Sequence, residues 1–453
     1  GVDGDREEVH RAGVGVEGVA GVEEGRLPGR GEDHAAVVDP LDVGMDDRVP
    51  VADGRESKGA ELDRPARPQT LRPPPVALGR QQLATAFESG AISGGFAMAE
   101  ALTAATDAFL GDLWPLAAEG VEDVSVLALG GYGRRELAFG SDLDVVIEVG
   151  EGMDTSSSLR ESLERFIAWM RVPRVKLSHA VRTPSQTMEA FADDFRTPVS
   201  YLDARILLGT PRVTAEDATR ALRADDQGCA FVDLLLSGYR ARLDRFGQTI
   251  YLLEPEVKSG KGGLRDLHVI RWAGLVRAGA DVGREPIESL GWTTRDAAAY
   301  REGHDWLLEV REMLHALHGR KHDRLHFRDQ ERLAQLLVEK APSVGVQVET
   351  LMRRHYQVTR AIAKLTERSL RRWQRCGTPT DTRIDEVFRI GDGTLFMAAE
   401  EPSTTEVFAA LRLASEHDAL LDPLAEERIE AAANSWGTHV RDDPANGAAL
   451  RHL

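Results

Sequence analysis

The first segment of the chain with a clear hydrophobic pattern begins at residue 97, where apolar side chains recur at helical spacing. Residues 97–118 place them every three or four positions, and Ser93 with two glycines supplies a plausible helix start. The run 124–129 is short and continuously apolar, which predicts a buried strand that a pair of glycines ends. A second strand is predicted over 143–149, after a Gly-Ser turn.

The pattern changes from mixed to helical near residue 230. A helix is predicted at 157–171 and an extended segment at 175–181. Residues 79–229 are therefore expected to form an α+β domain, with a short mixed sheet and accompanying helices. Residues 230–375 are almost wholly helical in pattern, apart from a Gly-rich stretch at 259–263, and are expected to form an all-α domain.

The two ends of the chain differ from this central part. Residues 1–78 contain no Phe, Tyr, Trp or Ile, so they cannot bury enough apolar surface to fold alone. We expect this segment to be a disordered leader. The alternative is a non-native segment, since Met98 could be the first residue of the native protein. Residues 376–453 are interpreted as a linker and the start of a truncated C-terminal module, with a β-like segment at 386–396 and two helices.

Charge and cysteine content narrow the class of partner. The 453 residues include 74 acidic and 56 basic ones, and the net charge of −18 argues against a nucleic-acid polymer as ligand. The two cysteines, Cys229 and Cys376, are interpreted as ordinary packing residues and are compatible with a cytoplasmic location. No run approaches the roughly 18 consecutive apolar residues of a membrane span, so no membrane association is expected.

The segment between the two predicted strands carries candidate chemistry. Asp142 and Asp144 stand two positions apart on a strand, so their side chains point to the same face and can bind the same metal ion. Gly130 and Gly131 let the backbone approach a triphosphate, and Ser141 can donate its hydroxyl to the same phosphates. Mg²⁺ (or Mn²⁺) held by carboxylates and substrate phosphates is typical of nucleotidyl transfer.

Each of these motifs alone has a structural explanation. Two glycines before a loop form a common turn, and Asp-x-Asp at a strand start is often a solvated edge. The order strand, two glycines, spacer, Ser-Asp-x-Asp and strand favours a site instead.

A second group of charges lies beside the Gly-rich stretch. Lys258, Lys261 and Arg265 bring three cations to one turn, which suits an anionic triphosphate or a leaving pyrophosphate. Asp266 could orient Arg265. The alternative is that the lysines are solvated loop charges and that Arg265 and Asp266 only begin a helix.

These motifs resemble a known family. The spacing of the glycine pair and Ser-Asp-x-Asp is similar to that of the DNA polymerase beta-like nucleotidyltransferase superfamily. The fuller string GGYGRRELAFGSDLDVV, the segment LEPEVKSGKGGLRD at 253–266 and the helical segment 310–325 resemble, in this order, the N-terminal part of the bacterial PII uridylyltransferase/uridylyl-removing enzymes. The resemblance covers about residues 79–375.

The resemblance implies an activity. Members move UMP from UTP to a tyrosine of a PII nitrogen-regulatory protein and release pyrophosphate, with Asp142 and Asp144 as catalytic metal ligands here. The glycine pair and Ser141 would hold phosphates, and the three cations would bind the pyrophosphate. Arg far outnumbers Lys in the chain, as expected of a GC-rich genome. Related enzymes of such bacteria include ones that adenylylate PII, so transfer of AMP from ATP is the alternative.

A third carboxylate on a neighbouring strand is common in the superfamily. The segment 175–183 resembles the family's strand at this place but contains no Asp or Glu. Asp194 and Asp203 are the remaining candidates. Asp203, on a predicted apolar helix, could equally be a helix-surface residue or form a buried salt bridge with Arg205.

The full-length family also has an HD phosphohydrolase module and ACT domains. The His-Asp pairs that begin at His304, His322 and His417 are interpreted as surface pairs. Leu453 lies about where the hydrolase module would begin, so nucleotide removal and glutamine sensing are expected to be absent from this chain. Two other functions stay open. One is a truncated, non-catalytic nucleotide-binding regulatory module. The other is a glutamine synthetase adenylyltransferase-like enzyme, against which the Gly-Gly-Leu-Arg-Asp segment argues.

Overall fold

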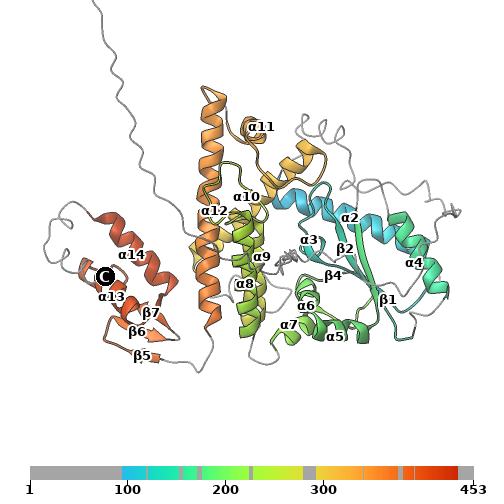
Figure 1. Ribbon diagram of the computed structural model, residues 1–453, viewed down its shortest axis with the longest axis horizontal. Coiled ribbons are helices and arrows are strands. Elements are labelled where there is room, and N and C mark those ends of the chain that lie inside the picture. Colours follow the sequence, from blue (N-terminus) through green and yellow to red (C-terminus); the bar gives the residue numbers. More distant parts are fainter. Residues whose placement is uncertain are drawn as a thin grey trace, which may run out of the picture. The chain divides into compact units, whose positions relative to one another are not determined.

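The computed structural model describes the chain between residues 94 and 436, with gaps (Figure 1). The described residues are 94–118, 121–152, 157–170, 176–223, 228–278, 292–339, 341–375, 381–391 and 393–436. The chain divides into the units Gly1–Val38 and Asp39–Leu453, and every described residue belongs to the second. The prediction for a leader at 1–78 therefore lies outside the described residues.

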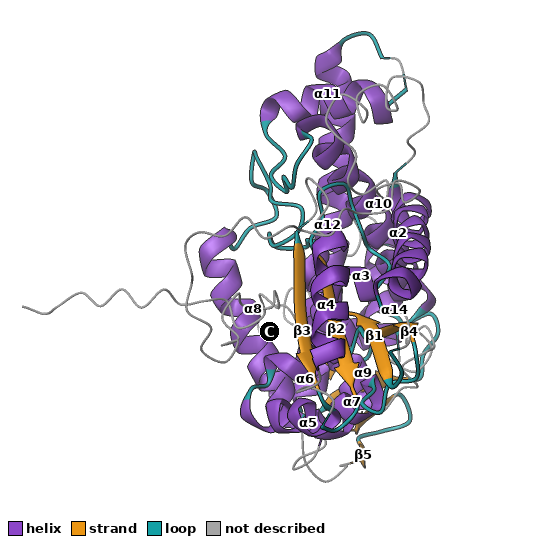
Figure 2. Ribbon diagram, turned by 90° about the vertical axis from the view of Figure 1, so that its right-hand side faces the viewer, coloured by secondary structure: helices purple, strands orange, loops and turns teal. Residues whose placement is uncertain are grey.

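A four-stranded mixed sheet forms the centre of the first part. Its strands are β1 (Val124–Ala128), β2 (Leu143–Val149), β3 (Leu177–Arg182) and β4 (Arg205–Leu208). Figure 2 shows them side by side in the order β3-β2-β1-β4, with β2 and β3 parallel and the other pairs antiparallel. The accompanying helices are α2 (Gly95–Ala117), α3 (Gly130–Gly133), α4 (Ser157–Met170), α5 (Pro184–Asp193), α6 (Arg196–Tyr201) and α7 (Ala215–Arg223).

Both faces of this sheet are buried, because alternate residues of each strand pack in opposite directions. Val126, Val145 and Ile147 pack in one core with α2 and α4. Leu127 and Val146 belong to a second core, which continues into the helical part of the chain. A strand buried on both faces has a continuously apolar sequence, and this explains the runs seen in β1 and β2.

The segment around Asp203 is not the predicted apolar helix. Helix α6 ends at Tyr201 and β4 begins at Arg205, so Asp203 lies in the turn between them. Strand β4 pairs with β1, and Leu208 lies opposite Val126. The run Arg-Ile-Leu-Leu is too short for its own pattern to distinguish helix from strand. Pairing with a strand about 80 residues earlier in the chain decides it.

The second part is helical, as predicted. It contains α8 (Cys229–Phe246), α9 (Leu264–Ala278), α10 (Thr294–His318), α11 (Phe327–Leu337) and α12 (Val344–Gln374). The long α12 packs against the other four, and the N-cap hydroxyls of Thr293 and Ser343 begin α10 and α12. None of the described helices is long and apolar enough to cross a membrane.

A smaller α+β module follows residue 380. Its strands and helices are β5 (Asp381–Arg383), β6 (Phe388–Gly391), β7 (Thr394–Met397), α13 (Thr404–Glu416), β8 (Leu420–Leu421) and α14 (Pro423–Ser435). The predicted β-like segment is the β6–β7 hairpin, and both predicted helices are present. Glu426 of α14 forms ion pairs with Lys364 and Arg368 of α12 at 2.8 and 2.7 Å, which connect this module to the helical part.

The interpretation of Cys229 as an ordinary packing residue is wrong. Cys229, the first residue of α8, is disulfide-bonded. The sequence has one other cysteine, Cys376, which lies outside the described residues.

Two helical glycines give a matched test of this fold. A methyl group at Gly111 in α2 would meet no atom within 4 Å, so Gly111→Ala should raise the free energy of unfolding by about 0.5–1 kcal/mol. A methyl group at Gly133 in α3 would lie 2.1 Å from the carbonyl oxygen of Asp203. We expect Gly133→Ala to lower the free energy of unfolding by more than about 2 kcal/mol in urea titrations followed by circular dichroism. Equal stability of the two variants would contradict the close approach of α3 to the turn before β4.

Candidate functional site

The turn between β1 and β2 brings the glycine pair against Asp144. The backbone N–H of Leu129 donates to the carbonyl of Asp144 at 2.9 Å, and Gly130 then turns the chain with a φ of +54°. A methyl group at Gly130 would lie 3.1 Å from Asp144 Oδ2. Glycine is therefore required here by both the backbone conformation and the space beside the carboxylate.

The two predicted metal ligands lie together at the start of β2. Burial and the negative charge of Asp142 raise the pKa of Asp144 to about 6. Asp142 Oδ2 lies 3.6 Å from Lys321 Nζ, whereas Asp144 has no ion pair within the described part of the chain. Ser141 is buried and accepts a hydrogen bond from the N–H of Ala138 at 3.0 Å, which leaves its hydroxyl proton available for a ligand.

Two crowded carboxylates of this kind fit a divalent cation. Oxygen donors from Asp are the ligands that Mg²⁺ and Mn²⁺ prefer, and a cation would relieve the repulsion that raises the Asp144 pKa. Asp142 and Asp144 are the residues that would hold it.

A cavity joins this turn to the helical part of the chain. It is lined by Gly130, Gly131, Ser141, Asp142 and Asp144 together with two of the predicted cations, Lys258 and Arg265. Four further basic residues line it: Arg134, Lys176, Arg311 and Lys321. The cavity therefore has Asp142 and Asp144 on its sheet side, and its cations come from both the sheet part and the helical part of the chain.

The electrostatics of Lys258 reflect this crowding of cations. Burial, and then the charges of Arg265, Arg311 and Lys321, lower the pKa of Lys258 to about 7. An anionic ligand in the cavity would restore the charged form of Lys258, since a nearby negative charge favours the ammonium.

The third predicted cation, Lys261, is not among the residues that line the cavity. Its Nζ forms an ion pair with Glu367 Oε1 of α12 at 2.7 Å. Asp266 pairs with Arg242 at 2.5 Å and accepts the N–H of Gly262 at 2.8 Å. Asp266 thus holds the Gly-rich turn.

Arg311 and Lys321 belong to the site but did not emerge from the sequence pattern. Both lie in the segment 310–325 that carries the third family motif, which is the one signal that could have suggested them. Arg311 is positioned by Asp323, whose carboxylate it contacts at 3.0 Å and whose pKa it holds well below the usual range. Lys176, just before β3, gave no signal of its own.

Both candidates for a third carboxylate have hydrogen-bond partners, and Asp203 lines the cavity. Asp194 is exposed at the end of α5 and accepts the N–H of Arg196. Asp203 is buried and accepts from Arg134 at 2.5 Å, from Trp272 Nε1 at 2.9 Å and from Arg271. Arg205 is not the salt-bridge partner of Asp203, because it pairs with Asp107 at 2.8 Å.

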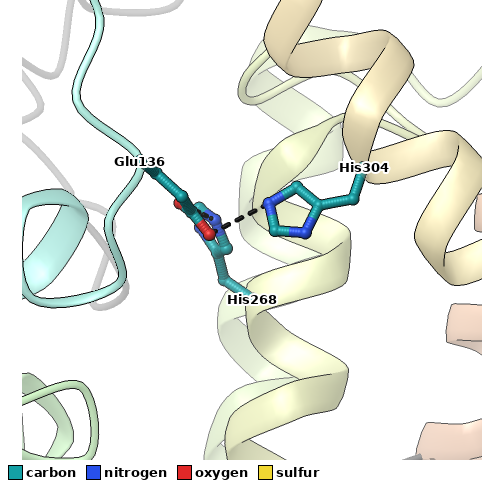
Figure 3. A group of neighbouring side chains, drawn as sticks. All are labelled: Glu136, His268 and His304. Atoms are coloured by element: carbon teal, nitrogen blue, oxygen red, sulfur yellow. Dashed lines mark hydrogen bonds and ion pairs between the residues drawn. The ribbon is translucent and has the colours of Figure 1, made fainter. Parts of the chain in front are cut away.

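A buried polar cluster connects the glycine turn to two helices (Figure 3). Glu136 Oε2 lies 2.8 Å from His268 Nε2, and Glu136 Oε1 lies 2.9 Å from His304 Nε2. Burial and the charge of Arg134 hold the pKa of His268 well below its usual range, so this imidazole is neutral. The interpretation of His304 as a surface residue is wrong, since it is buried in α10.

The cluster has metal-ligand residue types, but its charges favour a structural link. Arg134 Nε donates to the same Glu136 Oε2 at 2.8 Å, so a metal ion there would lie beside a guanidinium. The other two His-Asp pairs lie elsewhere: His417 is exposed, as interpreted, and His322 is partly buried.

The sequence of this chain is similar to those of known uridylyltransferases. Residues 230–370 match the family model described as GlnD PII-uridylyltransferase. A bifunctional uridylyltransferase/uridylyl-removing enzyme of Methylococcus capsulatus is 33% identical over 273 residues, which are 58% of this chain and 30% of that protein. Proteins of the same name from Burkholderia orbicola and Burkholderia mallei are 32% identical, over 53% and 58% of this chain and 28% and 30% of their own lengths.

These matches confirm the resemblance drawn from the motifs. The chain spans about a third of the length of the curated relatives that it matches.

The raised pKa of Asp144 generates a prediction about stability. A carboxyl whose pKa is higher in the folded than in the unfolded state binds its proton more tightly when folded, so it costs stability as pH rises from about 4 through about 6. Without divalent cations, Asp144→Asn should therefore raise the free energy of unfolding at pH 7.5 by about 1–3 kcal/mol. The gain should shrink by about half at pH 5.

Urea titrations in EDTA at the two pH values measure this difference. Asp112→Asn, on the exposed face of α2, is the control and should change stability by less than about 0.5 kcal/mol. A stability gain of Asp144→Asn that does not depend on pH would be inconsistent with a raised Asp144 pKa.

Proposed function

We propose that this chain, which carries a GlnD PII-uridylyltransferase domain at residues 230–370, moves UMP (or AMP) from UTP (or ATP) to a tyrosine of a PII-type protein and releases pyrophosphate. The observation that carries the proposal is the cavity in which Asp142 and Asp144 face Lys258 and Arg265. The strand–turn–strand part would be a nucleotidyltransferase domain.

The glycine turn suits the phosphates of the donor. Gly130 and Gly131 line the cavity without side chains, so a phosphate can approach the backbone closely. Ser141, with its hydroxyl proton free, would donate to a β- or γ-phosphate oxygen.

The cations of the helical side suit the leaving group. In the transfer, the tyrosine oxygen forms a bond to the α-phosphorus, the bond from that phosphorus to the bridging oxygen breaks, and the phenolic proton is lost. Negative charge then develops on pyrophosphate, where Lys258, Arg265 and Arg311 would stabilise it. A divalent cation held by Asp142 and Asp144 would, when bound, polarise the α-phosphate.

One observation favours a second function. Strand β3 offers Ser178 to the cavity but no carboxylate, and Asp194 and Asp203 have other partners. A regulatory module that binds a nucleotide and a PII-type protein without transfer is therefore the alternative. Release of pyrophosphate distinguishes the two, since binding alone produces none.

Replacing the paired carboxylates tests the proposed activity. Asp142→Asn and Asp144→Asn should each lower the rate of transfer at least about 100-fold, because they remove charge from the metal ligands. The measurement is the mass shift of a purified PII protein incubated with the chain, with UTP or ATP and with Mg²⁺ or Mn²⁺. Asp112→Asn should transfer at the wild-type rate. Full activity of both site variants would exclude this site, and nucleotide binding without pyrophosphate release would support the regulatory module.

The two lysines of the Gly-rich turn test which cations act. Lys258→Ala should reduce kcat/KM for the nucleotide by about tenfold or more, because Lys258 lines the cavity. Lys261→Ala should change it less than about twofold, since Lys261 pairs with Glu367 instead. Steady-state kinetics with varied nucleotide concentration measure both values. A larger loss in Lys261→Ala would return that residue to the site.

A further inference from the structure

A second group of metal-ligand side chains lies at the junction of α10 and α11. His318 ends α10, His322 lies in the loop that follows, and Asp329 lies in the first turn of α11. His318 Nε2 is 3.0 Å from Asp329 Oδ1, and His322 Nε2 is 3.6 Å from Asp329 Oδ2. The two imidazole rings have centroids only 3.8 Å apart.

Two atoms of this group are buried without a hydrogen-bond partner. Asp329 is 8% exposed, yet its Oδ2 has none, and neither has Nε2 of His322. A buried acceptor without a partner costs free energy, so such a pair calls for an explanation. Because the two atoms face each other across 3.6 Å, a single bound ion could satisfy both.

The spacing of the atoms fits a transition metal. The candidate ligand atoms of His318, His322 and Asp329 all lie within 4.8 Å of one another. A tetrahedral Zn²⁺ with bonds of about 2.0–2.2 Å holds its ligand atoms roughly 3.3–3.6 Å apart, which is within the range of the two measured separations, 3.0 and 3.6 Å. Two imidazoles and a carboxylate are the donor types that Zn²⁺ takes, with water in the fourth position.

The surroundings of the group also suit a cation. His318 keeps 28% of its side chain exposed, which leaves a path for an ion. His326 packs beside His322, with ring centroids 5.2 Å apart, and its Nδ1 lies 3.3 Å from Glu254 Oε2. In contrast to Glu136, Asp329 has no Arg or Lys ion pair within the described residues.

We propose that His318, His322 and Asp329 form a binding site for a transition-metal ion of the Zn²⁺ type, separate from the Asp142–Asp144 pair. The site would fix the loop between α10 and α11, and that loop carries Lys321, whose Nζ reaches Asp142 at 3.6 Å.

Metal binding to the untagged full chain tests the proposal. After treatment with EDTA and removal of the chelator, the protein is loaded with Zn²⁺, and the metal retained on gel filtration is counted by mass spectrometry. Competition with a chromophoric chelator then gives the affinity. We expect about one equivalent per chain, with binding at least tenfold weaker in His322→Gln and in Asp329→Asn.

Two control variants locate the ion. His304→Ala removes a histidine of the buried Glu136 cluster, and His417→Ala removes an exposed histidine of the C-terminal module. Both should bind Zn²⁺ as the wild type does. Thermal melts of the metal-free proteins identify any variant that has not folded. His318→Gln then replaces an unfolded ligand variant, and His417→Ala serves as the control if His304→Ala does not fold.

Three results would overturn the proposal. They are no stoichiometric Zn²⁺ in the wild type, wild-type affinity in folded His322→Gln and Asp329→Asn, or loss of binding in His304→Ala. Co²⁺ gives an independent readout, because a tetrahedral site with two imidazoles should produce visible absorption that His322→Gln weakens.

Discussion

The site depends on a buried ionic contact between the glycine turn and the helical part of the chain. Arg134 donates to Glu136 at 2.8 Å and to Asp203 at 2.5 Å, and all three side chains are at most 9% exposed. Charges this deeply buried persist only when each is paired, so removing one would leave the others uncompensated. Asp203 also accepts from Trp272 of α9, and Glu136 from His268 of the same helix. The contact therefore fixes the glycine turn relative to α9.

This connection explains how an acidic protein can hold an anionic ligand. The net charge is −18, yet six basic side chains line one cavity. The paired carboxylates Asp142 and Asp144 lie at the start of β2. Lys258 lies in the turn before α9, and Arg265 lies in the first turn of that helix. Lys258, Arg265, Arg311 and Lys321 come from the helical part, so the sheet part alone supplies only two of the six cations. The chemistry exists only where the two parts are held together.

The segment after α10 has a similar dependence on its neighbours. Within a few residues it supplies Lys321 to the cavity, Asp323 to Arg311, and His322 to the cluster with Asp329. One short loop thus lies between the proposed nucleotide site and the proposed transition-metal site. The loop begins at Gly319, which ends α10 with a φ of +60°, a conformation that favours glycine.

The sequence by itself determined the local features. Periodicity predicted the strands β1 and β2 and the helices of the second part, and the two-residue spacing of Asp142 and Asp144 predicted their common position, since alternation along a strand is a local property. The strand β4, the separation of Lys261 from Lys258 and the entry of Lys321 into the cavity came only from the tertiary structure. Each depends on a contact between residues far apart in the chain, and no local pattern encodes which distant partner a charge or a short apolar run will meet.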